Sequence, residues 1–275
     1  MAQTPQHLAA TPAVGPTRRD PVVLRNEGQR IFGVVHRPAV GVAPCAAVAI
    51  YHGFVGSKDQ PHQLYVKLAE ALARAGIVAL RIDFRGRGDS EGETVDITPA
   101  GDLGDATAAL TYLEGLPDVD AARLGLIGHS WGGTVAALLA GRDPRVRGTV
   151  LWNPPINVRE WDPPFEEIDG RQVLEVFGNL VGREFYAATR HIDPIAALVG
   201  VRGPVLVVQS GADEVVASAE FSRLKAALAD NHISHDGAVI DGADHAFMHH
   251  AWERDAIAHT VAWLQQALMA DATDR

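Results

Sequence analysis

One stretch decides the fold of this chain: LGLIGHSWGG at residues 124–133, which continues into TVAALLA at residues 134–140. It contains the pattern Gly-x-Ser-x-Gly around Ser130, set between an expected buried strand and an expected helix. A sharp turn at this point lifts the serine hydroxyl above the edge of a sheet, and the small flanking residues let the helix approach the strand. Because the helix begins at the serine, its dipole favours negative charge there. The stretch therefore predicts that Ser130 is a nucleophile.

A serine nucleophile needs a general base, and the base needs an acid that orients it. After a nucleophile in this setting the acid comes next along the chain and the histidine last. Asp213 follows an expected strand at 204–209, and His245 follows one near 237–240. We predict Asp213 as the acid and His245 as the base, with Glu214 as the rival for the acid.

Negative charge that develops on a substrate oxygen also needs hydrogen-bond donors. Trp131 follows the serine directly, so its backbone N–H is one expected donor. The second donor is expected from the loop HGFVGSK that begins at His52, where Gly53 lets the Phe54 N–H face the site. Phe54 and Trp131 are therefore the predicted oxyanion hole.

Short apolar runs alternate with helical stretches along most of the chain. Strands are expected at 21–25, 30–36, 46–51, 77–83, 123–128, 146–152, 204–209 and 237–240. Helices are expected at 62–75, 99–116, 134–140 and 253–269. This alternation predicts an α/β fold, with a mainly parallel central sheet and helices on both faces.

One long segment interrupts the alternation. Residues 153–195 hold two Pro-Pro doublets and several aromatic side chains, and they are much longer than a usual connection. We interpret them as a cap insertion over the carboxyl edge of the sheet, the alternative being a decorated crossover. The hydrolase core is expected at 21–152 and 196–275, after a flexible tail at 1–20. The residues expected to line a substrate pocket are His129, Trp161, Phe165, Phe177, Phe185, Tyr186 and Phe247.

The composition excludes several classes of protein. Acidic residues outnumber basic ones by 34 to 24, and no basic stripe is present, so no nucleic-acid partner is expected. No run is long enough for a membrane span, and the single cysteine, Cys45, is expected to be buried. A cytoplasmic location is the default expectation. His245 with His249 and His250 lacks the carboxylate or cysteine spacing that completes a metal site, so neither metal nor cofactor is expected.

The loop DFRGRGDSEG at residues 83–92 carries three glycines and mixed charges. It lacks the lysine of a phosphate-binding loop and the G-x-G-x-x-G spacing before a helix. We therefore expect a structural loop beside the pocket, held by ion pairs of Arg85 or Asp89.

From about residue 22 onward the chain resembles the α/β-hydrolase superfamily. The motifs that carry the resemblance are His52-Gly-Phe-Val-Gly, the loop at 83–92, Gly128-His-Ser-Trp-Gly-Gly, Gly211-Ala-Asp213 and Gly242-Ala-Asp-His245. Within it, the first motif and Val181-Gly-Arg-Glu-Phe look like bacterial feruloyl and cinnamoyl esterases, which often carry glutamine where this chain has Trp131. The resemblance implies a cofactor-independent hydrolase that cleaves small carboxylic esters, short-acyl or aryl, through an acyl-enzyme.

Other activities share the same residues. A thioesterase, a peptidase and a carbon–carbon hydrolase remain alternatives, as does a non-catalytic ligand-binding relative of the same fold. The expected partner is a small-molecule ester, and a homodimer is left open.

Overall fold

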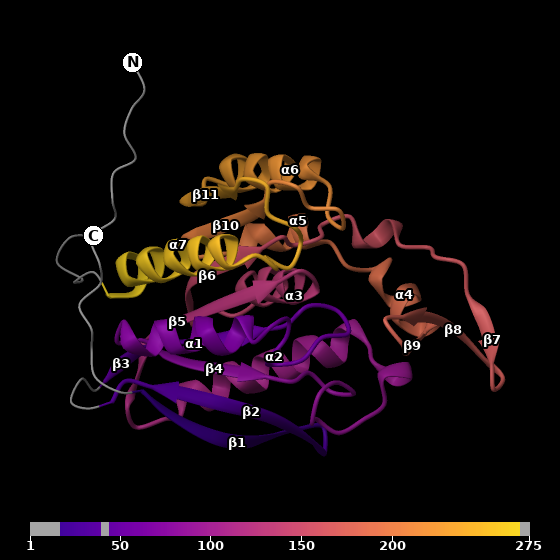
Figure 1. The fold of residues 1–275 in the computed structure, drawn as a ribbon, viewed down its shortest axis with the longest axis horizontal. Helices are drawn as coiled ribbons and strands as arrows, with labels where there is room; N and C mark the ends of the chain where they lie inside the picture. The colour runs from indigo at the N-terminus through magenta and orange to yellow at the C-terminus, as the bar shows by residue number, and fades with distance from the viewer. Residues whose placement is uncertain (1–16, 40–43, 270–275) are drawn as a thin grey trace.

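The computed structural model describes residues 17–39 and 44–269. Its main element is an eight-stranded sheet of order β1-β2-β4-β3-β5-β6-β10-β11 (Figure 1). The strands are β1 (Arg18–Asn26), β2 (Gln29–Arg37), β3 (Cys45–Tyr51), β4 (Val78–Ile82), β5 (Val119–His129), β6 (Val146–Trp152), β10 (Val205–Ser210) and β11 (His235–Ile240). Within this sheet, β4, β3, β5, β6, β10 and β11 are all parallel to their neighbours in that order. Strand β2 is antiparallel to both of its neighbours, β1 and β4. The predicted α/β-hydrolase fold is confirmed.

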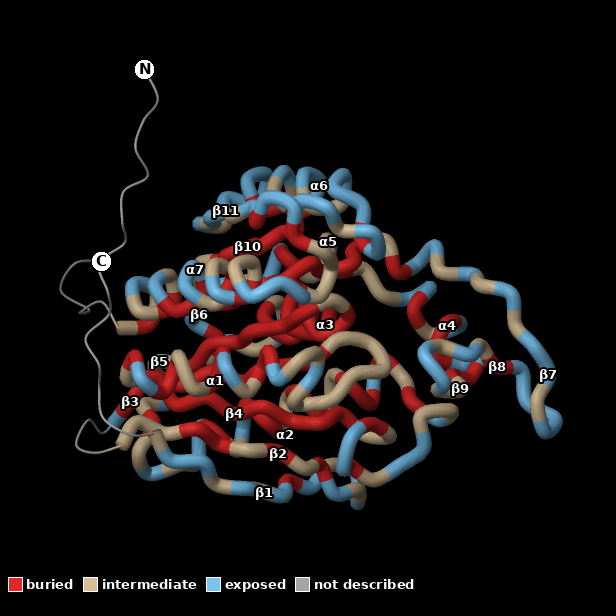
Figure 2. Tube along the Cα trace, viewed as in Figure 1, coloured by how far each residue is buried: buried red, intermediate tan, exposed pale blue. Residues whose placement is uncertain are grey.

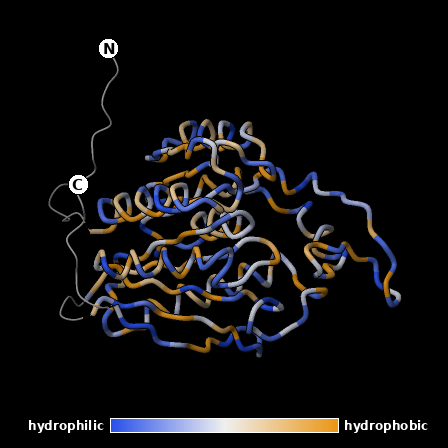
Figure 3. The backbone as a smooth tube through the Cα atoms, in the orientation of Figure 1, coloured by the Kyte–Doolittle hydropathy of each residue, from blue (hydrophilic) through white to orange (hydrophobic). Residues whose placement is uncertain are grey.

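Helices cover both faces of this sheet. They are α1 (Leu64–Arg74), α2 (Pro99–Glu114), α3 (Trp131–Ala140), α6 (Ser218–Asp230) and α7 (His250–Met269). Helices α1 and α7 share one apolar cluster, whereas α2, α3 and α6 share the other. The middle strands are buried along their length (Figure 2), and apolar residues follow one another there (Figure 3). A strand covered on both faces is apolar along most of its length, which explains the compact apolar runs in the sequence.

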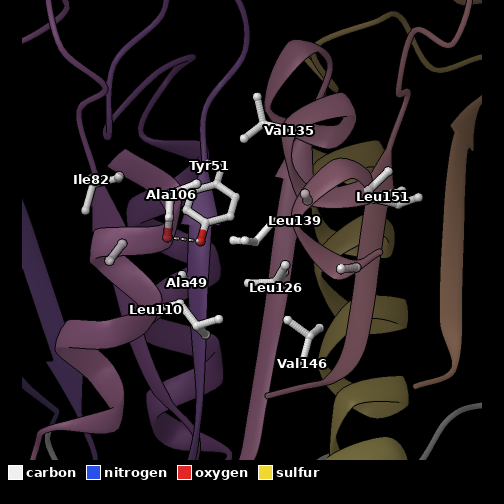
Figure 4. Packing of buried hydrophobic residues seen from close by; sticks show 14 of the residues in the cluster. Ala49, Tyr51, Ile82, Ala106, Leu110, Leu126, Val135, Leu139, Val146 and Leu151 are labelled. Carbon is white, nitrogen blue, oxygen red and sulfur yellow. Dashed lines mark hydrogen bonds between the residues drawn. The ribbon is translucent and has the colours of Figure 1, made fainter. Parts of the chain in front are cut away.

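Strand β3 shows how the two faces are filled. Val48 and Ile50 point into the cluster of α1 and α7, while Ala49 and Tyr51 point into the other. The Tyr51 hydroxyl donates to the carbonyl of Ala106 on α2 at 2.9 Å (Figure 4). Burial raises the pKa of Tyr51, so its hydroxyl stays a neutral donor that links the sheet to α2.

The opening hairpin and the cap of α2 form as the sequence predicted, whereas the tail and α6 differ from the prediction. The first two strands form a hairpin around Glu27-Gly28, and Thr98 caps α2 by accepting the Gly101 N–H at 3.1 Å. Arg18 to Asp20, expected within the tail, belong to β1, and residues 1–16 of the expected tail lie outside the described residues. Helix α6 was not predicted, because only Leu224 and Leu228 of its residues are buried.

The segment predicted as a cap folds into small elements of its own. It contains η2 (Val158–Glu160), β7 (Glu166–Ile168), β8 (Arg171–Val176), β9 (Asn179–Gly182), α4 (Arg183–Thr189) and the start of α5 (Pro194–Ala197). The strands form a separate three-stranded antiparallel sheet. This sheet and α4 lie beyond the carboxyl ends of the main parallel strands (Figure 1). Their short strands were not recognised in the sequence.

The loop at 83–92 is held by charged contacts, in line with the structural role expected of it. Lys58 Nζ lies 2.7 Å from Asp83 Oδ2 and 2.6 Å from Asp89 Oδ2, and Arg85 pairs with the buried Asp105. A Cβ on Gly88 would lie 2.2 Å from the Asp83 carboxyl carbon, so only glycine fits there.

None of the helices within residues 17–39 and 44–269 is both long and apolar enough to cross a membrane.

Candidate active site

Ser130 occupies a strained turn between β5 and α3. Its backbone has φ 54° and ψ −126°, and its N–H donates to the Trp152 carbonyl at 2.8 Å. A Cβ at Gly128 would lie 2.1 Å from the Gly132 carbonyl oxygen, and one at Gly132 would lie 2.3 Å from that of Tyr51. Both glycines of the motif are therefore required sterically, and the turn holds the serine in a conformation that few residues adopt.

His245 and Asp213 form a close pair. The imidazole Nδ1 lies 2.8 Å from Asp213 Oδ2 and 3.0 Å from Oδ1. Asp213 Oδ1 also accepts the amides of Val215 and Val216, each at 2.8 Å. Burial raises the pKa of this carboxyl, but hydrogen bonds from His245 and Val216 outweigh it and hold the pKa below its ordinary value. Asp213 is thus an ionised acceptor that can orient the imidazole.

The rival acid does not reach the imidazole. Glu214 is exposed, and within the described residues its carboxylate accepts only the backbone N–H of His245, at 3.4 Å. The histidine ring therefore pairs with Asp213, as the order of residues predicted.

Ser130 and His245 face a single cavity of about 600 Å³. Asp213 lies behind His245 and is not part of its wall, with a side chain only 1% exposed. The Ser130 hydroxyl has no hydrogen-bond partner in the described part of the chain. The two side chains predicted as nucleophile and base thus line the same space without a hydrogen bond between them.

Four of the seven predicted pocket residues line this cavity: His129, Trp161, Phe177 and Tyr186. The other three do not reach its wall. Phe185 is fully buried behind it, with its ring centroid 4.8 Å from that of Phe54. Phe165 packs on Tyr186, and Phe247 packs on Trp152 in the core. Phe185 and Phe165 fill the space between the sheet and the insertion, whereas Phe247 belongs to the apolar cluster shared by α1 and α7.

The two predicted oxyanion amides lie beside the serine. A Cβ at Gly53 would be 3.3 Å from Ser130 Cβ, so the loop with Phe54 passes directly against the turn. Trp131 is the first residue of α3, where amides have no partner within the helix. Among the described residues, neither the Phe54 nor the Trp131 amide donates to a protein acceptor. Both N–H groups are thus free to bind an oxygen in the cavity.

His52 fixes the loop that carries Phe54. Its Nε2 accepts the Phe84 N–H at 3.0 Å, so its Nδ1 carries the proton and donates to the Gly53 carbonyl at 2.7 Å. Burial, followed by the nearby Arg87 charge, lowers the pKa of His52 to about 3. The ring therefore acts as a neutral clamp.

His129 plays a similar part on the other side of the site. Its Nε2 lies 2.9 Å from the His245 carbonyl and must donate to it, while its Nδ1 accepts the Tyr65 hydroxyl at 2.8 Å. Burial, followed by the His245 charge, lowers the pKa of His129 to about 3. His129 thus positions the backbone of the candidate base as well as lining the cavity.

Asn153, which the sequence indicated only as the start of the insertion, is a second support of this backbone. Its Nδ2 donates to the His245 carbonyl at 2.8 Å and to Ser210 Oγ at 2.9 Å, and its Oδ1 accepts the Ser210 N–H at 2.7 Å. Ser210 Oγ in turn donates to the Asp244 carbonyl. The only signal in the sequence was an amide residue at a strand end.

Trp131 is anchored through its indole. The indole N–H donates to Asp102 at 2.7 Å, and Asp102 pairs with Arg87, both of them buried. Burial raises the pKa of Asp102, and Arg87 counters it. The anchor fixes the residue whose amide faces the cavity.

The cavity is mostly apolar and carries little charge. Among the described residues that line it there is no arginine or lysine, and Glu220 is the only carboxylate. Glu220 Oε2 already accepts the amides of Ile156 and Asn157, at 2.6 and 3.0 Å. No group of three His, Cys, Asp or Glu side chains in the described ranges is arranged to hold a metal ion.

Comparison with known proteins shows the family of this chain. Residues 42–184 match the model of the serine aminopeptidase S33 family. The chain belongs to this family. The chain is also 30% identical to an uncharacterised protein of Mycobacterium tuberculosis, over 79% of this chain and 70% of that protein.

One further relative and one solved structure span nearly the whole chain. A probable 2-oxo-3-(5-oxofuran-2-ylidene)propanoate lactonase of a Bradyrhizobium species is 28% identical over 89% of this chain and 90% of its own. The ferulic acid complex of Est1E from Butyrivibrio proteoclasticus superposes with a TM-score of 0.79 at 20% identity, covering 90% of this chain and 99% of that one. The S33 family member is thus a hydrolase with the α/β-hydrolase fold.

Proposed function

We propose that this S33 family member is a serine-dependent hydrolase of uncharged carboxylic esters, short-acyl or aryl. The observation that carries the proposal is the cavity itself. Ser130 on its strained turn and His245, paired with Asp213, face the same apolar space, and two unpaired amides lie beside the serine. These are the parts that acyl transfer to a serine requires.

The proposed reaction has two halves. His245 Nε2 takes the Ser130 proton as Oγ attacks the ester carbonyl, and the Phe54 and Trp131 amides bind the oxygen that becomes negative. The tetrahedral intermediate collapses, and His245 gives its proton to the departing alcohol, which leaves an acyl-serine. In the second half His245 takes a proton from water, the hydroxide attacks the acyl-serine, and the acid leaves as Ser130 regains its proton.

The lack of cationic side chains among the described residues of the cavity wall favours uncharged substrates. No described lining residue is cationic, so a substrate carboxylate would lose its hydration without gaining an ion pair. The Bradyrhizobium relative is named for a lactone that is a propanoate. The apolar lining of this cavity favours a neutral ester over such an anion, and the aromatic side chains of Trp161 and Tyr186 suit an aryl group.

A matched panel of esters tests the proposal. Wild type should hydrolyse 4-nitrophenyl acetate and butyrate and methyl ferulate, and should be much slower on the monoester anion 4-nitrophenyl succinate. Ser130→Ala should remove the activity while circular dichroism shows an unchanged fold. A phosphonate ester should label wild type at Ser130, as seen by mass spectrometry of peptides, and should not label the variant. Full turnover by the folded Ser130→Ala protein would sink the mechanism.

The family name favours one alternative, an aminopeptidase. Such an enzyme must bind the ammonium group of its substrate, and Glu220 is the only carboxylate among the described lining residues. Two backbone amides already occupy one of its oxygens. Amino-acid 4-nitroanilides should therefore be cleaved far more slowly than the neutral esters, and the reverse order would favour the peptidase.

A further inference from the structure

Three hairpins of the described chain turn through two residues of the form X-Gly. They are Glu27-Gly28 between β1 and β2, Asp169-Gly170 between β7 and β8, and Phe177-Gly178 between β8 and β9. In each, both residues have positive φ: 49° and 85°, 50° and 75°, and 49° and 77°. The three turns thus share one backbone shape, and only the third carries a bulky apolar residue at its first position.

Phenylalanine is poorly suited to that position. A residue with positive φ favours glycine, asparagine or aspartate, and an aromatic side chain there costs conformational energy. Packing does not offset this cost, because Phe177 is 93% exposed and its ring meets no other ring among the described residues. Asn179 Nδ2, which donates to the Val176 and Phe177 carbonyls, holds the turn without help from the phenyl ring.

The location of this turn separates it from the other two. Val176, Phe177 and Asn179 line the cavity over Ser130, whereas neither Glu27 nor Asp169 does. The other cap aromatics of the wall are already packed: Tyr186 is 6% exposed and Trp161 lies against Phe54. Among the described residues, Phe177 is therefore the aromatic side chain at the cavity whose ring packs on no other ring.

We infer that Phe177 is a specificity-determining residue, whose ring packs on an apolar group of the substrate remote from the ester bond. This inference rests on the proposed function. Substrates with a ring that reaches the tip of the β8–β9 hairpin gain a contact that small esters do not. An aromatic contact of this kind contributes on the order of fivefold in affinity, which is about 1 kcal/mol at 1.4 kcal/mol per tenfold.

The test compares two uncharged esters, benzyl 3-phenylpropanoate, which has a ring on both sides of the ester bond, and ethyl acetate, which has none. Phe177→Asn creates the Asn-Gly sequence that this turn shape favours, so the unfolding free energy should stay the same or rise. The ratio of kcat/KM for the large ester to that for the small one should fall about fivefold. Phe177→Tyr should keep the wild-type ratio, and the matched control Asp169→Asn should change neither rate.

A binding measurement separates this inference from the proposed function. In a Ser130→Ala background, quenching of tryptophan fluorescence by benzyl 3-phenylpropanoate should show a Kd about fivefold higher with Phe177→Asn. If wild type hydrolysed neither ester but this Kd still rose, the proposed function would fail and the role of Phe177 would stand. An unchanged Kd, or equal losses on both esters, would overturn the inference.

Discussion

Replacing Asn153 with alanine tests how far the His245 backbone depends on residues outside the predicted catalytic set. The substitution removes three buried hydrogen bonds, one to the His245 carbonyl and two that join Asn153 to Ser210. At about 1 kcal/mol each they sum to about 3 kcal/mol. Asn153 also has φ 45°, which asparagine tolerates better than alanine, so a further cost of about 1 kcal/mol is expected.

The activity should fall as well. The His245 carbonyl would keep only the His129 donor at 2.9 Å, so the candidate base would be held less firmly. We expect kcat for 4-nitrophenyl acetate to drop roughly tenfold, since small displacements of catalytic groups are costly. Urea unfolding followed by circular dichroism, together with steady-state kinetics, measures both effects.

Two further variants isolate the cause. Asn153→Gly removes the same hydrogen bonds but fits the positive φ, so it should lose about 3 kcal/mol without the backbone cost. Asn231→Ala removes an exposed side chain whose Nδ2 donates to the Ala227 carbonyl, and should cost under about 1 kcal/mol. The reasoning is refuted if Asn153→Ala loses no more stability than Asn231→Ala and keeps wild-type kcat.

Three more predictions follow from the site. Asp213→Asn should leave the protein folded but cut kcat by roughly a thousandfold or more, whereas Glu214→Gln should be mild; kinetics showing the opposite order would reassign the acid. In the folded protein the pKa values of His52 and His129 are about 3, below the unfolded value near 6.5. The unfolded chain therefore binds more protons below pH 6.5, so the free energy of unfolding is greatest above pH 6.5 and falls as the pH drops from 6.5 toward 3. Urea midpoints at pH 7 and 5 should show this loss, and a higher midpoint at pH 5 would contradict it. Activity should survive dialysis against EDTA, and rescue by zinc of a chelated, inactive enzyme would reopen a metal site.

Much of the fold was predictable because its signals are local. A strand buried on both faces is largely apolar, so β3 is visible as an uninterrupted run, and β4 and β6 are visible as apolar runs despite Arg81 and Arg147. The turn at Ser130 is local at Gly128, where a Cβ would meet the backbone of Gly132, whereas Gly132 is required by the carbonyl of Tyr51 at the end of β3. The order of serine, acid and histidine then pointed to Asp213 and His245, because each follows a parallel strand and those strands end at one edge.

What the sequence could not show depends on residues far apart in the chain. Asn153 and Ser210 are 57 positions apart and become a pair only when β6 and β10 lie side by side. The small β7–β9 sheet is weakly patterned because its strands are short and largely exposed.

The pocket aromatics show the same division. Composition marked the insertion as rich in rings, but it could not tell which of them face the cavity. The packing of the insertion against the sheet buries Phe185 and leaves Phe177 at the mouth of the cavity. By itself, then, the sequence determined the scaffold and the order of the reactive residues, since strand burial and tight turns depend on near neighbours. The tertiary structure alone decided the charge of the cavity, the supports of His245 and the exposed ring at its entrance, since these arise where distant segments meet.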